Sequence, residues 1–434
     1  MYSACVAASF EGKTYMKYIE ELKKYITENV RDMTREPGGA LKHKYIVPTS
    51  PLSPYYSTNL WDWDSWLASV VMGQVEADSG KTGEFLEYER GCALNFLDNM
   101  TDEGFMPICI TPQGFLHLDE EKEKVFKTNM HKPVLAQHIA FLVQRDGGRT
   151  DWIESRLPAL ERFINCYLER YMELQTGLMY WQDDMAVGVD NDPAVFYRPD
   201  ASCGSIYLNC LMYRELLAFG YLMEMRGDMT KANAFRFKAQ TLADAINKWC
   251  WDERDGMYYS VDFALRPVNA GDWLHSGAPR DYPCVLTRID SWSGFMALWA
   301  GIADEKQAAR VMERARDKRT FACKAGVRSL SRLEKMYDLR ASNNPSNWRG
   351  PVWGISNFML FSGMLKYGYT DDATEMAHKT IELFGRDLEK SGSLHEYYNP
   401  DTGEPIVTHD FQNWNFLVLN MIAWLEERRF VDTF

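Results

Sequence analysis

The sequence predicts an all-α protein, an (α/α)6 barrel in which six helical hairpins form two concentric layers. Three observations predict it. Apolar residues recur at helical spacing, amphipathic helices alternate with helices that are apolar all round, and long connections alternate with short ones. Because all the long connections of such a ring emerge at one end, that end is expected to carry the functional site.

Twelve helices are expected, and they alternate in character along the chain. The odd-numbered ones, such as 228–251, have one apolar stripe and fit an outer layer. The even-numbered ones, such as 204–226, lack a polar face and are expected to be buried on every side. Asp304, with Gln307 three residues later, is typical of a capped helix start. The predicted ranges are 14–33, 61–78, 82–98, 131–145, 151–173, 204–226, 228–251, 289–302, 304–317, 351–367, 370–388 and 412–427.

The connections between the predicted helices also alternate. Even-to-odd joins are short and rich in Gly or Asp, whereas odd-to-even joins are several times longer than usual helix–helix loops. Four long joins place Gly after a polar turn residue, which predicts short β-hairpins at the rim of the site: 102–106, 175–180, 254–259 and 401–404. No linker or low-complexity segment interrupts the chain, so residues 1–434 are expected to form one domain.

Composition limits the functions that the protein can have. A hydrophobic fraction of 46% is that of a soluble globular protein, and a net charge of -13 argues against nucleic acid and anionic membrane surfaces as partners. No apolar window approaches membrane-spanning length, and the first ten residues do not resemble a signal peptide. The nine cysteines lack a CxxC pattern, which favours buried thiols in the cytoplasm. No metal site or cofactor is expected, and the oligomeric state stays open.

Two acidic residues distant in sequence are candidates for proton transfer. Asp190 lies between the fifth and sixth predicted helices, and Glu396 lies between the eleventh and twelfth. Both joins are long ones, so the barrel brings both carboxylates to the same end. A pair of carboxylates across a sugar-sized cleft is the minimum machinery for cleaving a glycosidic bond. From pattern alone, however, an Asp-rich string such as 190–193 is equally typical of turns and helix caps.

Several motifs together resemble glycoside hydrolase family 63. Residues 188–193 (Gly-Val-Asp-Asn-Asp-Pro) resemble its Gly-x-Asp-Asn-Ser-Pro signature, and more loosely the Gly-Trp-Asp string of trehalases. Residues 348–353 (Trp-Arg-Gly-Pro-Val-Trp) match a string that both groups share. Residues 396–403 match the Glu-Tyr-Tyr-x-Pro-x-Thr-Gly string of family 63, and 61–65 are similar to its Trp-Asp-Ser/Thr-aromatic string. The resemblance runs from about residue 55 to 415.

The compact length looks most like the mannosylglycerate and glucosylglycerate hydrolases of that family. The resemblance implies an (α/α)6 barrel that hydrolyses a small α-glucoside or α-mannoside with inversion, the leaving group being glycerate, glycerol or a second sugar. It maps the general acid onto Asp190 and the general base onto Glu396. Inversion needs room for a water molecule, so the two carboxyl groups are expected to lie roughly 6.5–9.5 Å apart.

Further residues are candidates for binding the substrate. Trp63 and Asp64 resemble the family's sugar-binding pair, although a helix start with an N-capping Asp is the alternative. Arg349 offers a fork for carboxylates or hydroxyls, or forms a structural ion pair that holds the general-base loop. Trp181 and Gln182 are expected to line the wall near the acid, with core packing as the alternative. The other candidates are Tyr56, Trp348, Trp353, Tyr397, His409, Gln412 and Trp414.

Two positions depart from the family's pattern. Lys132, in His-Lys-Pro-Val (131–134), stands where the family often has Gln. It could bind an anionic group of the substrate, such as a glycerate carboxylate or a uronic acid, or form a salt bridge to Asp64 or Glu396. Asp192 replaces the Ser of the signature, and its charge is expected to raise the pKa of the nearby acid.

Two other classes of function remain open. A different sugar enzyme on the same barrel, an epimerase or a lyase, would use His or Tyr as a base, and the chain has only eight His, few of them near the motifs. A non-catalytic sugar-binding protein would bind a glycoside without cleaving it. In every case a small carbohydrate is the expected partner.

Overall fold

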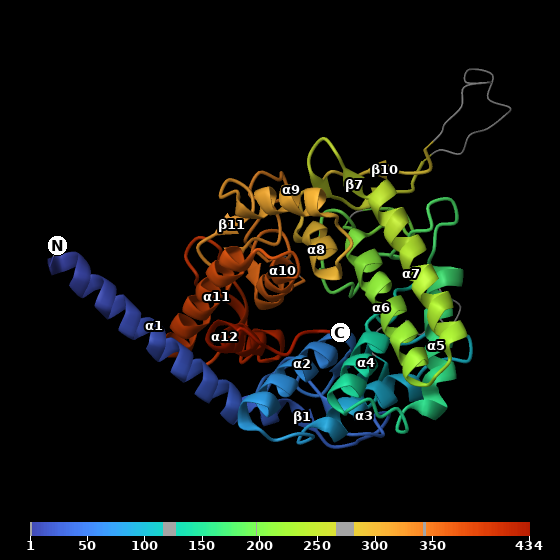
Figure 1. Ribbon diagram of the computed structural model, residues 1–434, viewed down its shortest axis with the longest axis horizontal. Coiled ribbons are helices and arrows are strands. Elements are labelled where there is room, and N and C mark those ends of the chain that lie inside the picture. Colours follow the sequence, from blue (N-terminus) through green and yellow to red (C-terminus); the bar gives the residue numbers. More distant parts are fainter. Residues whose placement is uncertain (1, 116–126, 197, 266–281, 342–343) are drawn as a thin grey trace.

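The computed structural model of the protein describes residues 2–115, 127–196, 198–265, 282–341 and 344–434, with side chains from residue 15 onward. Within these ranges the chain forms a ring of helices around a central axis (Figure 1). The α-helices are α1 (Tyr2–Asn29), α2 (Asp62–Ser79), α3 (Leu86–Asp98), α4 (Leu135–Arg145), α5 (Leu157–Arg170), α6 (Ile206–Met225), α7 (Met229–Trp249), α8 (Met296–Ala300), α9 (Glu305–Arg316), α10 (Gly354–Lys366), α11 (Thr370–Ser391) and α12 (Val418–Glu427).

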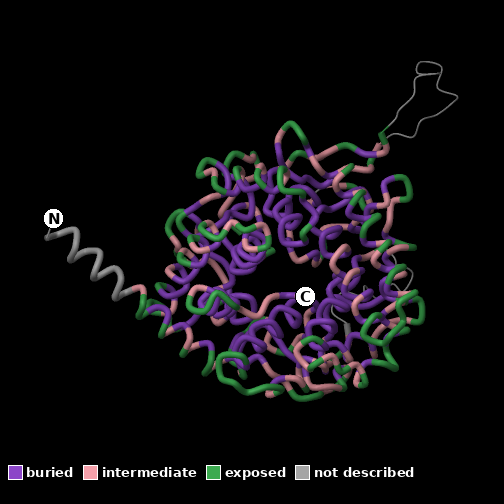
Figure 2. Tube along the Cα trace, in the orientation of Figure 1, coloured by how far each residue is buried: buried purple, intermediate pink, exposed green. Residues whose placement is uncertain are grey.

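The helices form two layers, as predicted. The even-numbered helices are buried on nearly every side, whereas the odd-numbered ones bury one face and expose the other (Figure 2). Each inner helix packs against the next around the ring, and α12 packs against α2, which closes it. The outer α1 packs against α11 in the same way. The prediction of an all-α fold with the (α/α)6 arrangement is confirmed.

The helix boundaries differ from the predicted ones for local reasons. The eighth and twelfth helices begin as 3₁₀ turns, η4 (Trp292–Phe295) and η5 (Asn413–Leu417), before α8 and α12. The fifth begins with η3 (Glu154–Arg156), and the first ends before η1 (Val30–Met33). The fourth begins late, at Leu135, because a residue that precedes a proline avoids the helical region.

The predicted capping box of α9 is present. The carboxylate of Asp304 accepts a hydrogen bond from the backbone N–H of Gln307 (2.8 Å), and the side chain of Gln307 accepts one from the backbone N–H of Asp304 (2.9 Å). Two N–H groups that the first turn would leave unpaired are therefore satisfied.

Short antiparallel strands lie in the long connections between helices. They are β1 (Thr34–Arg35), β2 (Tyr45–Ile46), β3 (Leu60–Trp61), β4 (Cys109–Thr111), β5 (Gly114–Phe115), β6 (Cys203–Gly204), β7 (Trp251–Asp252), β8 (Met257–Tyr258), β9 (Val261–Asp262), β10 (Val285–Leu286), β11 (Ala322–Cys323), β12 (Gly326–Val327), β13 (Val352–Trp353), β14 (His395–Tyr398) and β15 (Pro405–His409). The hairpins predicted around 254–259 and 401–404 form as β7–β8 and β14–β15. A single isolated bridge forms around 175–180, and 102–106 makes a turn without a strand.

The described part of the chain contains no helix that is both long and apolar enough to span a membrane. The eight cysteines whose side chains the structure describes are all buried, and all have free thiols.

The contact between α1 and α11 depends on a glycine. A Cβ atom added to Gly385 would lie 2.3 Å from Cγ of Tyr18, which is 7% exposed and packs on α11. We therefore expect Gly385→Ala to destabilise the protein by about 1–3 kcal/mol, although alanine is intrinsically the better helix former. Gly220→Ala in α6, where the nearest atom would be 3.3 Å away, is the matched control. Urea denaturation checks both, and a Gly385→Ala variant as stable as Gly220→Ala would contradict this account.

Candidate active site

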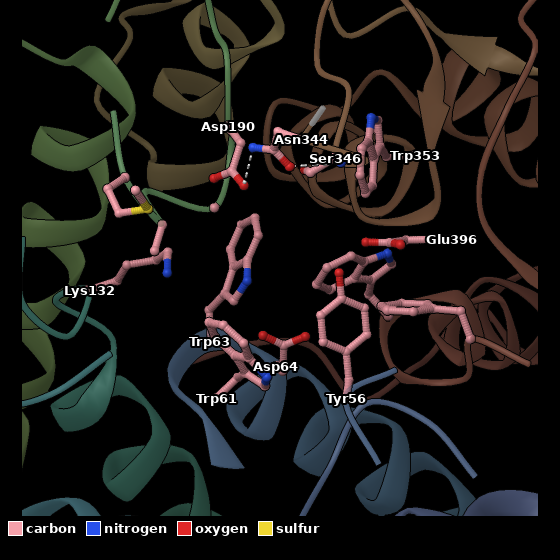
Figure 3. Close-up of a pocket in the computed structure, with 15 residues that line it drawn as sticks. Tyr56, Trp61, Trp63, Asp64, Lys132, Asp190, Asn344, Ser346, Trp353 and Glu396 are labelled. Atoms are coloured by element: carbon pink, nitrogen blue, oxygen red, sulfur yellow. Dashed lines mark hydrogen bonds between the residues drawn. The ribbon is translucent and has the colours of Figure 1, made fainter. Parts of the chain in front are cut away.

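A cavity of about 500 Å³ opens at the end of the ring where the inner helices begin (Figure 3). Its wall combines segments that precede or open the inner helices α2, α4, α6, α10 and α12, so residues far apart in sequence share it. The described residues that line it are Tyr56, Trp61, Trp63, Asp64, Lys132, Met185, Ala186, Gly188, Asp190, Asn344, Ser346, Trp353, Glu396, Phe411 and Trp414. Asp190 and Glu396 thus face one cavity from different walls.

Asp190 lies in the connection between α5 and α6, and a second connection holds this loop in place. The side-chain amide of Asn191 donates to the carbonyl of Ser346 (2.8 Å) and accepts from the backbone N–H of Trp348 (3.0 Å). Asn191 has a φ of 53°, a left-handed conformation that Asn tolerates better than most residues. Asn344 donates to the carboxylate of Asp190 (3.3 Å). Hydrogen bonds therefore join the loop with Asp190 to the loop of residues 344–348.

Gly188 allows this loop to approach the floor of the cavity. Its φ is 93°, and an added Cβ atom would lie 2.7 Å from Cε of Lys132 and 2.9 Å from the ring of Trp63. A larger residue would push the Asp190 loop away, so the geometry of the site requires glycine here.

Glu396 sits in the middle strand of the β13–β14–β15 sheet. Side chains alternate along a strand, so Glu396 faces the cavity while its neighbour Tyr397 faces the other side. The hydroxyl of Tyr397 donates to the carbonyl of Pro345, which ties the strand to the loop that carries Asn344. Glu396 is only 5% exposed.

Burial controls the protonation of both carboxyl groups. The pKa of Glu396 is raised to about 7, mainly by burial and also by the charge of Asp190, against a hydrogen bond from Thr408 that lowers it. Burial also raises the pKa of Asp190, while the bond from Asn344 and the charge of Lys132 oppose the rise. Because the charge of Asp190 raises the pKa of Glu396, ionisation of Asp190 disfavours ionisation of Glu396.

Asp64 is a third carboxyl group at the cavity. It lies in the first turn of α2, is 7% exposed and accepts a hydrogen bond from the side chain of Asn413. Burial raises its pKa to about 8, with the charges of Asp62 and Glu396 adding to the rise and that of Lys132 opposing it. The N-cap of α2 is Trp61, so Asp64 is not the capping residue that the alternative interpretation required.

Lys132 forms a salt bridge, but with neither of the two predicted partners. Its ammonium group contacts the carboxylate of Asp62 at 2.9 and 3.1 Å, and the prediction of a pair with Asp64 or Glu396 is wrong. Asp62 belongs to the same motif as Trp63 and Asp64 but is not part of the cavity lining, and it also accepts a hydrogen bond from the backbone N–H of Lys132 (2.8 Å). Lys132 still lines the cavity.

The charge of Asp192, which was expected to raise the pKa of Asp190, is not among the main contributions to it. Asp192 turns away from the cavity and accepts hydrogen bonds from the hydroxyls of Ser291 (3.2 Å) and Ser293 (2.8 Å). The neighbouring carboxylate that raises the pKa of Asp190 is Asp184. Asp192 therefore anchors the loop against η4.

Aromatic rings form most of the remaining wall. The rings of Trp63 and Trp414 lie 5.4 Å apart and nearly edge to face, and Tyr56 packs edge-on against Phe411 at 6.3 Å. Such faces suit the apolar surface of a pyranose ring. The predicted binding residues that line the cavity are Tyr56, Trp63, Asp64, Lys132, Trp353 and Trp414.

The other predicted binding residues lie outside the cavity lining: Trp181, Gln182, Trp348, Arg349, Tyr397, His409 and Gln412. Trp348 stacks on Trp353 from behind, with ring centroids 4.4 Å apart. Trp181 is 2% exposed and packs on Tyr207. Tyr397 also packs on Trp353, with ring centroids 4.5 Å apart, so these aromatic residues support the wall rather than form it.

The polar members of this group have local roles. Arg349 donates to the carbonyl of Arg340 (3.3 Å), so neither of its two predicted roles is seen in the described contacts. His409 is exposed and pairs with His395 across β15 and β14. The backbone N–H of Gln182 donates to the side chain of Asn129 (2.8 Å), and that of Gln412 donates to the carbonyl of Pro48 (3.2 Å).

Seven residues of the lining were not predicted as site residues. Trp61 and Gly188 lie inside motifs that the sequence analysis used, and the other five are Met185, Ala186, Asn344, Ser346 and Phe411. Met185 and Ala186 lie just before the Gly188 motif, and Phe411 lies between two predicted residues. The loop with Asn344 and Ser346 precedes the Trp348 motif by a few positions. Proximity to a motif was the signal available for all five.

The fold and the site together define a class of protein. A sugar-sized aromatic cavity with facing carboxyl groups, at the loop end of an (α/α)6 barrel, is the arrangement of a glycoside-processing enzyme. Residues 57–414 match the mannosylglycerate hydrolase MGH1-like glycoside hydrolase domain, and the chain belongs to this family. The predicted resemblance is therefore confirmed.

Individual relatives agree with this assignment. The chain is 26% identical over 202 residues to a mannosylglycerate hydrolase from Rubrobacter radiotolerans, covering 46% of this chain and 39% of that protein. It is 29% identical over 168 residues to a cytosolic neutral trehalase from Pyricularia oryzae, covering 38% of this chain and 20% of that protein. The chain thus spans less than half the length of these relatives.

A solved structure extends the similarity to nearly the whole chain. The family 63 mannosylglycerate hydrolase from Thermus thermophilus, in complex with glucose, has a TM-score of 0.61 at 19% identity, covering 93% of this chain and 98% of that one. At this identity the likeness supports the fold, and the site must be argued from its own residues.

The raised pKa of Glu396 has a consequence for stability. Because the folded protein holds a proton on Glu396 that the unfolded chain releases above its ordinary pKa near 4.5, stability falls as the pH rises from about 4.5 through 7. We expect Glu396→Gln to be more stable than the unmodified protein at pH 9, by about 1–3 kcal/mol, and nearly equal at pH 4. Denaturation at both pH values checks this. The exposed Glu103→Gln is the control, and an equal gain in that variant would contradict the account.

Proposed function

We propose that the protein is an inverting α-glycoside hydrolase that acts on a small α-glucoside or α-mannoside, with glycerate, glycerol or a second sugar as the leaving group. One observation carries the proposal. Asp190 and Glu396, from loops far apart in sequence, face one 500 Å³ cavity, and the charge of one raises the pKa of the other. A cavity of this volume suits a ligand of one or two sugar units.

Asp190 is the proposed general acid. It donates a proton to the glycosidic oxygen as the bond to the anomeric carbon breaks, which requires the protonated form. Burial, which raises its pKa, supports that form. The amide of Asn344 and the hydrogen bonds of Asn191 fix the direction of the carboxyl group.

Glu396 is the proposed general base. It removes a proton from a water molecule that attacks the anomeric carbon from the opposite face, which inverts its configuration. With a pKa of about 7, Glu396 is about half ionised at neutral pH and mostly ionised above it, and it is still basic enough to accept a proton. The proposed mechanism requires the proton on Asp190 and the negative charge on Glu396 when the substrate is bound.

The remaining lining supports the binding of a sugar. Trp63, Trp414 and Tyr56 offer aromatic faces, and Asp64 offers oxygens for hydroxyl groups. Relatives named mannosylglycerate hydrolase and neutral trehalase give the range of leaving groups that we include.

We also infer that the closed ring acts as one domain. The buried free thiols support our inference that the protein is cytoplasmic.

Features of the lining favour hydrolysis over the alternatives. An epimerase or a lyase would need a His or Tyr base. The described lining contains no His, and burial raises the pKa of its tyrosine, Tyr56, which disfavours the ionised form that would act as a base. A purely binding protein gains nothing from burying the charge of Glu396, whose raised pKa reflects the cost of that burial.

Replacing either carboxylate should abolish turnover. We expect Asp190→Asn and Glu396→Gln each to lower kcat by about 10²–10⁴-fold, the range for a lost acid or base, while circular dichroism remains unchanged. The measurement is release of reducing sugar from a panel of α-glucosides, α-mannosides and glyceryl or glycerate glycosides. Asp200→Asn, exposed in the same loop, is the control. Wild-type rates in both site variants would refute the assignment.

The stereochemistry and the roles of the two groups can be tested separately. ¹H NMR early in the reaction should detect the β-anomer of the released sugar, because a water attacks opposite the leaving group. An α-glycosyl fluoride needs little protonation to leave, so Asp190→Asn should keep much of its activity on it, whereas Glu396→Gln should lose it. An α-anomer as first product, or the reverse pattern of the two variants, would overturn the mechanism.

A further inference from the structure

A buried ion pair, Lys132 with Asp62, forms part of the cavity wall. The ammonium of Lys132 contacts the carboxylate of Asp62 at 2.9 and 3.1 Å, and these side chains are 2% and 0% exposed. The same carboxylate accepts from the backbone N–H of Lys132 (2.8 Å) and from that of Trp63 (2.7 Å). Asp62 thus joins the start of α2 to the segment that precedes α4.

The pair touches two parts of the catalytic site. The ammonium of Lys132 lies 5.3 Å from the ring centroid of Trp63, within the range of a cation–π interaction. The side chain also lies against Gly188, where an added Cβ atom would come within 2.7 Å of Cε. Figure 3 shows the ammonium on the same side of the cavity as Asp190. Lys132 is therefore in contact with the loop that presents the acid.

Lys132 dominates the positive charge at the site. Of the cavity-lining residues that the structure describes, it is the only cation. Its charge lowers the pKa of both Asp190 and Asp64, whereas the charge of Asp62 raises that of Asp64.

The other groups that face these carboxyls are few. Asp184 raises the pKa of Asp190, and Asp190 in turn raises that of Glu396. His131 is buried beside Lys132, with its pKa lowered by burial to about 4, so it is neutral at neutral pH. The hydroxyls of Tyr56 and Tyr207 have raised pKa values and are neutral too.

We propose that Asp62 and Lys132 are a positioning pair: Asp62 holds Lys132 between Trp63 and the Gly188 loop and partly neutralises it, so that the pair sets the positive charge felt by Asp190 and Asp64. This rests on the proposed role of Asp190 as the proton donor. A buried ion pair adds little net stability, because desolvation of the charges offsets their attraction. Because the pair contacts the loop that carries Asp190, its effect is expected on the protonation of Asp190 rather than on the stability of the fold.

Single substitutions on the two sides of the pair should have opposite effects. Lys132→Gln removes the positive charge, so Asp190 should hold its proton more strongly and the alkaline limb of kcat/KM should move up by about 1 pH unit. Asp62→Asn keeps the acceptor oxygen but leaves Lys132 without its neutralising partner. The proton on Asp190 should then be held less strongly, and the same limb should move down by about 0.5–1 unit.

A double variant and a control separate charge from structure. Asp62→Asn with Lys132→Gln replaces the ion pair by two amides that can hydrogen-bond, so the limb should return to within about 0.3 unit of wild type. Lys44→Gln removes a lysine that pairs with Glu87 (2.9 Å) away from the cavity lining and should not move the limb. Shifts of both single variants in the same direction, or lower kcat without any shift, would overturn the proposal.

A measurement without substrate keeps this proposal distinct from the proposed function. In protein labelled with ¹³C at the Asp carboxyls, the Asp190 resonance is the one that disappears in Asp190→Asn. Its pH titration should shift upward in Lys132→Gln and downward in Asp62→Asn. Opposite shifts without hydrolysis of any glycoside would refute the proposed function alone. Hydrolysis of a glycoside with an unshifted Asp190 titration would refute the positioning pair alone.

Discussion

The packing of α12 against α2 is the interaction on which the site depends. Six apolar helices must each be covered on every side, and a row of hairpins leaves the first and last uncovered. Closing the row into a ring covers both, with Asn420 of α12 donating to the carbonyl of Val70 in α2 (3.4 Å). Asn413, at the start of η5, reaches Asp64 at the start of α2. The same closure that completes the core therefore brings the Glu396 strand and the α2 motif to one cavity.

Closure of the ring also buries the carboxyl groups at the cavity, and this burial raises their pKa values. Glu396 and Asp64 are nearly buried, so burial is the largest contribution to the rise of each pKa. Burial of this kind costs stability above the ordinary pKa of a carboxyl group. The ring supplies that stability through its two layers of packed helices, while hydrogen bonds from Asn344 and Thr408 limit the rise for Asp190 and Glu396. The site is thus a locally unfavourable arrangement that the rest of the fold holds in place.

Much of the fold could be predicted from sequence because its signals are local. Periodicity gave all twelve helices, and alternation of apolar character gave the two layers. The motifs led to the cavity because strand alternation and the start of a helix fix where Glu396 and Asp64 point. Supporting aromatic residues were harder to place: Trp353 and Trp348 are identical in type and five positions apart, yet the first lines the cavity and the second stacks behind it. The local sequence pattern does not show which of two nearby tryptophans lines a cavity and which packs behind it.

The two departures from the family pattern had different outcomes for a physical reason. Asp192 has local partners, two serine hydroxyls at the start of η4, and is not among the main contributions to the pKa of Asp190. Lys132 pairs with Asp62, which lies 70 positions earlier in the chain, next to Trp63 and Asp64. No spacing in the sequence indicates this pairing. Gly188 accommodates the resulting side chain, because a Cβ atom there would collide with it. The effect of the charge on Lys132 therefore depends on three features. Asp62 binds the ammonium group, Gly188 leaves space for the side chain, and the loop with Asp190 lies close enough to be affected by the charge.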